Sequence, residues 1–345
     1  MFQIYTRFGL LAFCLTFGVG LSPAKADAVL FQLDNDKVVD TDRHYTNGVR
    51  FAYTPTPDKK QPSQLQTTGK VLAKFAYFKE PHQLRTGWSF GQEMYTPEDV
   101  ETYTPDPKDR PYAGWTYFGI TMQNNIPAST LATGFFAGLD RQDTMELDIG
   151  WVGPKSKAGQ VQNSIHRMLN VSVSHGWRSQ IKDELGLLGT RTIKLRTKQT
   201  DLFGFEGDSI VHTTAHLGNV KTSISSGMTV RFGKNLKEDF GPVYGTFAVP
   251  QKAPKNLTWS TFFGFEGKAV ARDIFLDGNT FKDGPDVKKT PFVLEARLGI
   301  SSHIPINSVY VKGVRLSLSM VNRTREFKAQ DKSDRYGSVQ ASFNF

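Results

Sequence analysis

The chain has 345 residues and a mass of 38.6 kDa, with 39% hydrophobic and 22% charged residues and a formal net charge of +9. This composition excludes a disordered tail and a small disulfide-bonded scaffold. A mean hydropathy of -0.37, with no long apolar run beyond the N-terminus, excludes a bundle of membrane-spanning helices. A soluble fold or a membrane protein built from strands remains, and 31 glycines and 26 phenylalanines favour the second.

Residues 1–26 have the pattern of a secretory signal peptide. Arg7 precedes an apolar run that is too short to span a membrane, and Ala24-Lys25-Ala26 fits a cleavage site. The only cysteine, Cys14, lies in this segment, so we expect neither disulfides nor cysteine-bound zinc in the mature chain. Residues 27–345 are predicted to form a single domain. The excess basic residues are spread along it, which favours an anionic lipid as partner and no nucleic acid.

From Asp27 onward, hydrophobic and polar residues alternate between clusters of Gly, Pro, Asn and Asp, a pattern that predicts antiparallel strands. The candidate strands are Ala28 to Asp34, Thr46 to Thr54, Leu84 to Tyr95, Tyr112 to Gln123, Thr144 to Gly153, Arg191 to Leu202, Ser209 to Leu217, Thr222 to Phe232, Thr258 to Ala271, Phe292 to Ser302, Val309 to Asn322 and Tyr336 to Phe345. They make twelve strands, an even number, as transmembrane barrels have.

Alternation by itself does not distinguish a soluble sandwich from a barrel, because both architectures give each strand one apolar face. The last strand favours a barrel. Val339, Ala341, Phe343 and Phe345 alternate there with polar residues. A final amphipathic strand that carries Phe345 resembles the signal read by the outer-membrane barrel assembly machinery, which we expect as a partner. We therefore predict an all-β fold, a transmembrane, antiparallel, up-and-down β-barrel of twelve strands with a short helix in an extracellular loop.

Two segments interrupt the strands with a helical pattern. Leu65 to Phe78 is a candidate amphipathic helix that lies on the membrane interface or at the rim of the barrel. In the segment Gly159 to Leu169, the side chains of Val161, Ile165, Met168 and Leu169 share one face, which we expect to be packed. Gln162 and His166 are four residues apart and share the adjacent face, so an amide and an imidazole should lie side by side at the edge of that packed surface.

Strand parity brings the unusual polar residues to one rim. If both termini are periplasmic, the connections after odd strands are extracellular. These connections and the strand ends beside them hold Asn35, Asp36, Thr46 and the helix with Gln162 and His166. A carboxylate, amides, a hydroxyl and a histidine are the composition of a hydrolytic site. Each is ordinary loop chemistry when taken alone, so these residues by themselves favour an enzyme only modestly over a passive channel.

At these residues the chain resembles the lipid A 3'-O-deacylase (LpxR) family of Gram-negative outer membranes. The matching blocks are Asn35-Asp36, Thr41-Asp42-Arg43 with Tyr45-Thr46-Asn47-Gly48, Gln92 to Pro97, Asp109-Arg110-Pro111-Tyr112-Ala113-Gly114, Gly150 to Pro154, and Val161-Gln162-Asn163 with His166-Arg167. The resemblance implies a twelve-stranded barrel in the outer membrane of a Gram-negative bacterium. It also implies a calcium-dependent ester hydrolase that removes the 3'-linked acyloxyacyl group from lipid A, the membrane anchor of lipopolysaccharide.

The resemblance further implies roles for individual residues. His166 would be the base that activates water, a task that suits imidazole because it titrates near neutral pH. Asp36 would help to hold Ca²⁺, with Asn35 and Thr46 completing a polar wall. Gln162 would orient the imidazole or the water.

The chain departs from the family pattern at two places. The glutamate expected six residues after the histidine is replaced by Ser172, and a basic pair expected in the second outer loop is replaced by an acidic segment around Glu101 and Thr102. The phosphate groups of the substrate would then be contacted by Lys108 and Arg110, or by Lys155 and Lys157 beside the helix.

Two other functions remain open at this point. One is a barrel without catalytic activity, either a small channel or a surface-binding protein. The other is a calcium-dependent phospholipase, which would use the same base and the same cation chemistry on a different ester.

Overall fold

A computed structural model describes residues 27–36, 44–55, 67, 69, 71–72, 84–130, 137–241 and 253–345, although not the side chains of 44–46 and 238. The predicted signal peptide lies outside these residues. Among the described residues, no helix combines the length and the apolar character needed to cross a membrane. In the segment predicted as an amphipathic helix, the described residues Thr67, Gly69, Val71 and Leu72 are helical.

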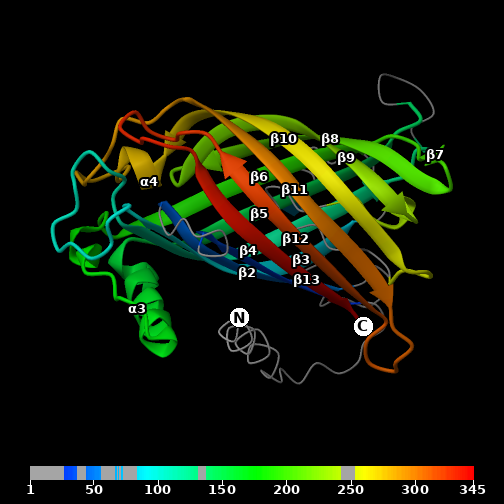
Figure 1. The fold of residues 1–345 in the computed structure, drawn as a ribbon, viewed down its shortest axis with the longest axis horizontal. Coiled ribbons are helices and arrows are strands. Elements are labelled where there is room, and N and C mark those ends of the chain that lie inside the picture. The colour runs from blue at the N-terminus through cyan, green and yellow to red at the C-terminus, as the bar shows by residue number, and fades with distance from the viewer. Residues whose placement is uncertain are drawn as a thin grey trace.

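Strands account for most of the described chain (Figure 1). Their bounds are β1 Ala28–Asn35, β2 His44–Thr54, β3 Arg85–Thr96, β4 Ala113–Ile126, β5 Asp140–Val152, β6 Glu184–Arg196, β7 Thr200–Leu202, β8 Phe205–Gly218, β9 Lys221–Lys234, β10 Thr258–Asp273, β11 Phe292–Pro305, β12 Gly313–Arg323 and β13 Asp334–Asn344. Beyond the helical residues between Thr67 and Leu72, the α-helices of the described chain are α3, Ala158–Leu169, and α4, Ile274–Asp277.

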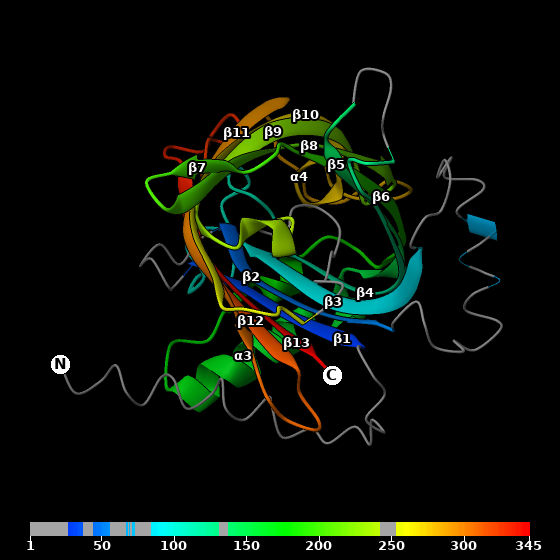
Figure 2. The same ribbon diagram turned by 90° about the vertical axis from the view of Figure 1, so that its right-hand side faces the viewer.

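The strands close into an antiparallel barrel. Neighbours in sequence pair with each other, β1 pairs with β13, and β6 pairs with β8. The three-residue β7 pairs with β8 beside this ring, so twelve of the described strands form the barrel, as predicted. Figure 2 looks along the barrel and shows the ring of strands around a central space. The predicted fold class is confirmed.

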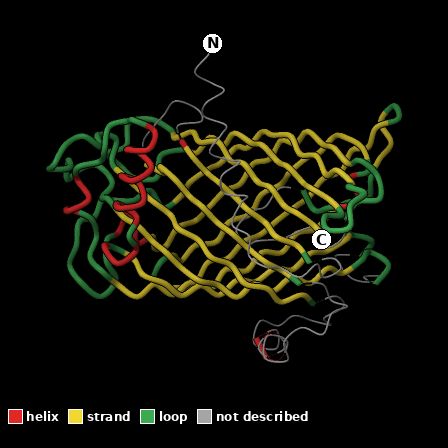
Figure 3. Tube along the Cα trace, turned by 90° about the horizontal axis from the view of Figure 1, so that it is seen from below, coloured by secondary structure: helices red, strands yellow, loops and turns green. Residues whose placement is uncertain are grey.

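The two ends of the barrel differ. We call the end that holds α3, α4 and the connections after β1, β3, β5, β8, β10 and β12 the outer rim, and the opposite end the inner rim. In Figure 3 most of the helical residues lie at the outer rim, and the last strand ends at the inner rim near the C-terminus. The connections that carry the predicted site residues therefore share one rim, as strand parity required.

The barrel is apolar outside and polar inside. Large apolar side chains such as Phe90, Phe118 and Ile149 point outward and are about half exposed. The inward-facing residues include Arg50, whose guanidinium donates to Glu146 at 2.9 Å. The alternation seen in the sequence is therefore the pattern of a barrel in lipid, whose apolar face looks outward. A cavity of about 170 Å³ remains in the interior, lined by residues that include Glu93, Tyr95, Trp115, Tyr117 and Asp148.

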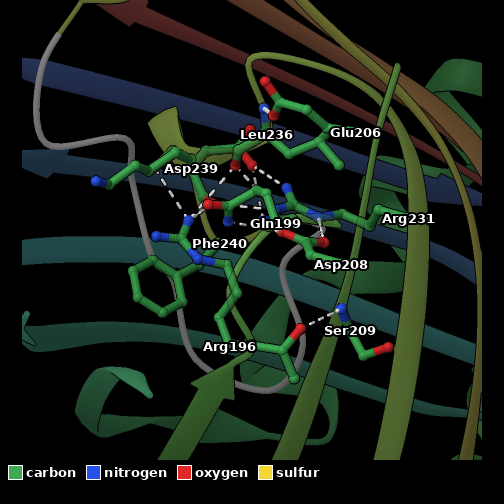
Figure 4. Close-up of polar contacts among 12 residues, drawn as sticks. Arg196, Gln199, Glu206, Asp208, Ser209, Arg231, Leu236, Asp239 and Phe240 are labelled. Carbon is green, nitrogen blue, oxygen red and sulfur yellow. Dashed lines mark hydrogen bonds and ion pairs between the residues drawn. The ribbon is translucent and has the colours of Figure 1, made fainter. Parts of the chain in front are cut away.

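A cluster of buried ion pairs lies inside the barrel near the inner rim (Figure 4). Arg231 donates to Asp208 at 2.6 Å and to Asp239 at 2.5 Å, and Arg315 reaches the other oxygen of Asp239 at 3.0 Å. Arg196 donates to the main-chain carbonyls of Leu236 and Asp239. Asp239 follows β9, so this connection folds back into the barrel and is held there by charge.

The largest difference between a predicted strand and the structure is at β6. The sequence predicts a strand from Arg191 to Leu202, whereas β6 begins seven residues earlier, at Glu184, and ends at Arg196. The shift has a physical cause: Glu184 accepts hydrogen bonds from Asn219, Asn279 and the main chain of Thr280, partners that lie far away in sequence. These contacts fix the start of β6 at the outer rim.

Candidate active site

The connection between β5 and β6 places α3 against the outer surface of the barrel wall. The carbonyl of Ser156, in the 3₁₀ turn Pro154–Ser156 before α3, accepts hydrogen bonds from Gln92 at 2.8 Å and Thr116 at 2.7 Å. The neighbours of these residues in β3 and β4, including Glu93 and Trp115, line the interior cavity, so Gln92 and Thr116 face outward. The helix therefore begins outside the ring of strands, where it projects beyond the barrel wall in Figure 1.

A glycine in β4 allows this close approach. A Cβ atom on Gly114 would lie 2.2 Å from Cβ of Ala158, the first residue of α3, and 2.4 Å from Oγ of Ser156. Ala158, Gln162 and His166 are the buried residues of α3, and they follow one another at intervals of four along the helix. The helix thus turns its polar pair toward the protein.

Three side chains of α3 are hydrogen-bonded to the segment Ser172–Trp177. His166 Nδ1 lies 2.6 Å from the carbonyl oxygen of Ser172. The amide of Asn163 donates to the carbonyl of Ser174 at 3.0 Å and accepts from its N–H at 2.8 Å. Gln162 Oε1 accepts from the indole of Trp177 at 2.7 Å. The segment therefore forms a wall along one flank of the helix.

The contact to Ser172 sets the tautomer of His166. A carbonyl oxygen can only accept, so Nδ1 carries the proton and Nε2 carries the basic lone pair of the neutral ring. The expected glutamate is missing at this position, yet the main chain of the same residue supplies the oxygen that orients the imidazole. The side chain of His166 is 6% exposed, so the ring is held in place by its surroundings.

Gln162 was predicted to orient either the imidazole or the water, and the structure does not show the first of these contacts. Its Oε1 is bound to Trp177 and not to the imidazole, and among the described residues its buried Nε2 has no hydrogen-bond partner. Gln162 is 3% exposed. A buried amide N–H₂ without a partner is costly, and a bound ligand with an acceptor oxygen would satisfy it.

Asn35, Asp36 and Thr46 lie at the same level of the barrel as the start of α3. The strand register aligns Asn35 with Asn47, Asn47 with Met94, and Met94 with Gly114. The backbone of Thr46 forms a β-bulge, a feature that often re-aims residues next to active sites; its side chain lies outside the described residues. Asp36 follows β1 and is 1% exposed.

The distance across the sheet from Asn35 to the start of α3 is similar to the distance along α3 to His166. Three strand intervals separate Asn35 from Gly114, which is about 14 Å, and the eight residues from Ala158 to His166 advance by about 12 Å. Since α3 starts on β4 and also contacts β3, the helix can carry His166 along the wall toward β1 and β2. Residues 37–43, which follow Asp36, lie outside the described part of the chain.

The described residues do not form a complete metal cage: among them no group of three or more His, Cys, Asp or Glu side chains is arranged to hold an ion. The donor chemistry near Asp36 nevertheless suits a hard cation, because a carboxylate and the amide and carbonyl oxygens of Asn35 are the ligands that Ca²⁺ prefers. Water or substrate oxygens would have to complete the coordination.

The four basic residues predicted to contact phosphate divide into two groups. Arg110 is 1% exposed, donates to Glu326 at 3.2 Å and lies over the ring of Tyr95 at 4.8 Å. It therefore joins two outer connections. Lys108, Lys155 and Lys157 are exposed, and the ammonium of Lys155 lies 4.2 Å from the ring of Trp151. These lysines remain available to an anionic ligand at the outer rim.

Sequence reasoning missed the wall segment and its support. Trp177 packs on Tyr112, with ring centroids 5.0 Å apart, and a Cβ on Gly159 would lie 2.6 Å from the indole. Burial raises the pKa of Tyr112 to about 12, so its hydroxyl stays protonated and donates to the carbonyl of Val100. Asn163 belongs to the recognised block of α3, which is the only sequence signal for this support.

The predicted packed face of α3 is wrong. Val161, Met168 and Leu169 are 37%, 69% and 45% exposed, whereas Gln162 and His166 are buried. The reason is that the helix lies outside the barrel, where the protein offers it polar partners and the surroundings offer an apolar medium.

Comparison with known proteins agrees with this architecture. The family model described as "Outer membrane protein LpxR" matches residues 10–345. The structure of LpxR from Salmonella typhimurium superposes with a TM-score of 0.68 at 19% identity, covering 92% of this chain and 100% of that one. The β domain of the Bordetella autotransporter BrkA covers 93% and 98% at 7% identity, with a TM-score of 0.42. No curated protein matches the sequence. The chain belongs to the LpxR family of outer-membrane proteins.

Proposed function

We propose that this protein is a lipid A deacylase that hydrolyses the 3'-linked acyloxyacyl ester. The observation that carries the proposal is the placement of two buried polar groups, Gln162 and His166, between α3 and the outer surface of the barrel wall. Lipid surrounds that surface in an outer-membrane barrel, so a lipid ester can approach these two residues without leaving the membrane.

His166 supplies the base. Its Nδ1–H is held by the carbonyl of Ser172, and Nε2 removes a proton from water as the water attacks the ester carbonyl. The protonated imidazole then returns the proton to the leaving alkoxide, so that the ester becomes a carboxylic acid and an alcohol. The Nε2 donor of Gln162 is available to an oxygen of the substrate.

Asp36 and Asn35 would hold a calcium ion beside Gln162 and His166. When bound, the cation supplies positive charge that stabilises negative charge on the ester oxygen. Lys108, Lys155 and Lys157 are exposed at the same rim and would attract the phosphate groups of lipid A.

Mass spectrometry of lipid A tests this function. Cells that express the protein should lose one acyloxyacyl group from lipid A, and the loss should fall by about 10²- to 10⁴-fold in His166→Ala, the range for removing a general base. Membranes treated with a chelator should also retain the group.

Ser164→Ala is the matched control on the same helix. The Ser164 hydroxyl bonds only within α3, to the carbonyl of Gln160, and is exposed. It should leave the activity unchanged. Intact lipid A from correctly folded wild-type protein, or equal loss in His166→Ala, would contradict the proposal. Release of fatty acid from glycerophospholipids alone would support the phospholipase alternative.

A further inference from the structure

The unusual feature of α3 is that most of its apolar side chains are exposed. Val161, Ile165, Met168 and Leu169 form this set, which we call the apolar flank. Ile165 is half-buried and the other three are exposed. An exposed apolar patch on a helix marks an interaction surface, and its position decides which partner it fits.

The opposite flank of α3 faces the outer loops. It is bonded to the segment Ser172–Trp177 through Asn163 and His166. That segment in turn contacts the connection between β3 and β4: His175 N–H donates to the carbonyl of Val100, and the His175 ring stacks on Tyr103 at 4.5 Å. Because this connection extends beyond the strand ends, the bonded flank points away from the barrel and the apolar flank points back toward the strands.

The surface below the apolar flank is the apolar belt of the barrel. Trp151 lies in the same row as Thr116, which anchors the start of α3, and it is 42% exposed. The next outward row toward the inner rim contains Phe90, Phe118 and Ile149, all about half exposed. The belt therefore begins one row below the start of α3, with a tryptophan at the level where membrane interfaces are rich in this residue.

The charge of α3 fits the same location. The helix contains no Asp or Glu, and exposed Arg167 and Lys157 lie on it and at its N-terminus. A helix with one apolar flank and basic residues beside it is typical of the surface of an anionic membrane.

We propose that α3 is an interfacial helix whose apolar flank is seated among the acyl chains of the outer leaflet. Gln162 and His166, the buried polar pair of the same helix, then lie at the level of the lipid headgroups. The proposal does not rest on the hydrolytic function, because it concerns only where the helix lies.

Depth-dependent quenching tests this placement. The only cysteine, Cys14, lies in the predicted signal peptide, so Met168→Cys gives a single thiol for a polarity-sensitive fluorophore. The labelled protein, residues 27–345, is placed in vesicles of phosphatidylcholine and phosphatidylglycerol whose acyl chains carry a nitroxide. We expect quenching at Met168→Cys at least about half as strong as at Leu298→Cys in the belt, where the side chain is 62% exposed.

Two controls make the result decisive. Lys108→Cys lies in an exposed outer loop and should show little quenching, and Val161→Cys should behave like Met168→Cys if the whole flank is seated in lipid. Quenching at Met168→Cys no greater than at Lys108→Cys would overturn the proposal. So would a blue-shifted label without lipid quenching, together with disulfide-linked dimers of the unlabelled Met168→Cys protein, because a second copy of the chain would then cover the flank. None of these readouts depends on activity.

Discussion

At the scale of single residues, the approach of α3 to the wall depends on the absence of one side chain. A Cβ on Gly114 would overlap Ala158 and Ser156, and neither partner is the end of a flexible side chain. Gly114→Ala should therefore displace α3 and leave the strands paired. It should also lower deacylation by at least about tenfold, because a shift of about 1 Å at a catalytic group can cost 10²-fold.

Limited proteolysis of the connection between β5 and β6 measures the displacement of α3. Heat-dependent gel migration measures whether the strands remain paired. Gly267→Ala is the matched control, because its Cβ would meet only Leu294 at an ordinary 3.6 Å. Equal protease resistance and activity in Gly114→Ala and wild type would show that the helix does not need this contact.

The carbonyl of Ser172 also belongs to the residue scale. A prediction based on side chains expects a loss when a glutamate becomes serine, yet an oxygen from the main chain contacts His166 Nδ1. No pattern of side chains reveals this contact, because it depends on the path of residues 170–177. That path starts at Asn170, which has a φ of 54° and ends the helix in the left-handed region that asparagine tolerates.

At the scale of elements, a buried ion pair joins two outer connections. Arg110 precedes β4 and Glu326 follows β12, and Arg323 also donates to Glu326 at 3.2 Å. Burial opposes ionisation of Glu326, but Arg323 and Arg110 outweigh it and hold its pKa at about 2, below its ordinary value of 4.5. A depressed carboxyl pKa stabilises the fold above the ordinary value, and this contribution is lost as the pH falls from about 4.5 to about 2.

Glu326→Gln should therefore lower the melting temperature at pH 7, because it leaves buried Arg110 with a weaker partner, at a cost of about 3 kcal/mol. The difference from wild type should shrink between pH 4.5 and pH 2. Thermal unfolding in detergent, followed by circular dichroism, measures it. Glu101→Gln, an exposed carboxylate of the second outer loop, is the control and should change little. A difference that is constant from pH 7 to pH 2 would contradict this account.

At the scale of the whole molecule, the filled interior argues against a channel. Arg50, Asp148 and Glu295 line the interior cavity, and the ion pairs around Asp239 lie inside the barrel near the inner rim. The wild-type protein should therefore show no large steady conductance in a planar bilayer.

Asp239→Ser should raise the conductance. It removes the carboxylate that Arg231 and Arg315 share, and the two buried guanidiniums then repel each other and release the connection that they hold. Asp201→Ser, on the exposed β7 hairpin, is the control. A wide, steady pore in the wild type would restore the channel alternative, and unchanged conductance in Asp239→Ser would show that other residues close the barrel.

The sequence by itself determined the architecture and the rim that carries the site. Alternation with a period of two is a local property, so twelve strands, their order and the rim shared by Asp36, Gln162 and His166 followed from it. Their proposed roles as calcium ligand and base stay predictions.

The tertiary structure decided which face of α3 is buried and which distant segments are in contact. The apolar flank of α3 looked like a packed surface, because a helical pattern does not record whether the medium beside it is protein or lipid. Arg110 looked like a phosphate ligand, because its partner Glu326 is 216 residues away. The start of β6 depended on Asn279 and Asn219 for the same reason. Contacts between distant segments form only when the barrel closes, and closure sets the register that brings them together.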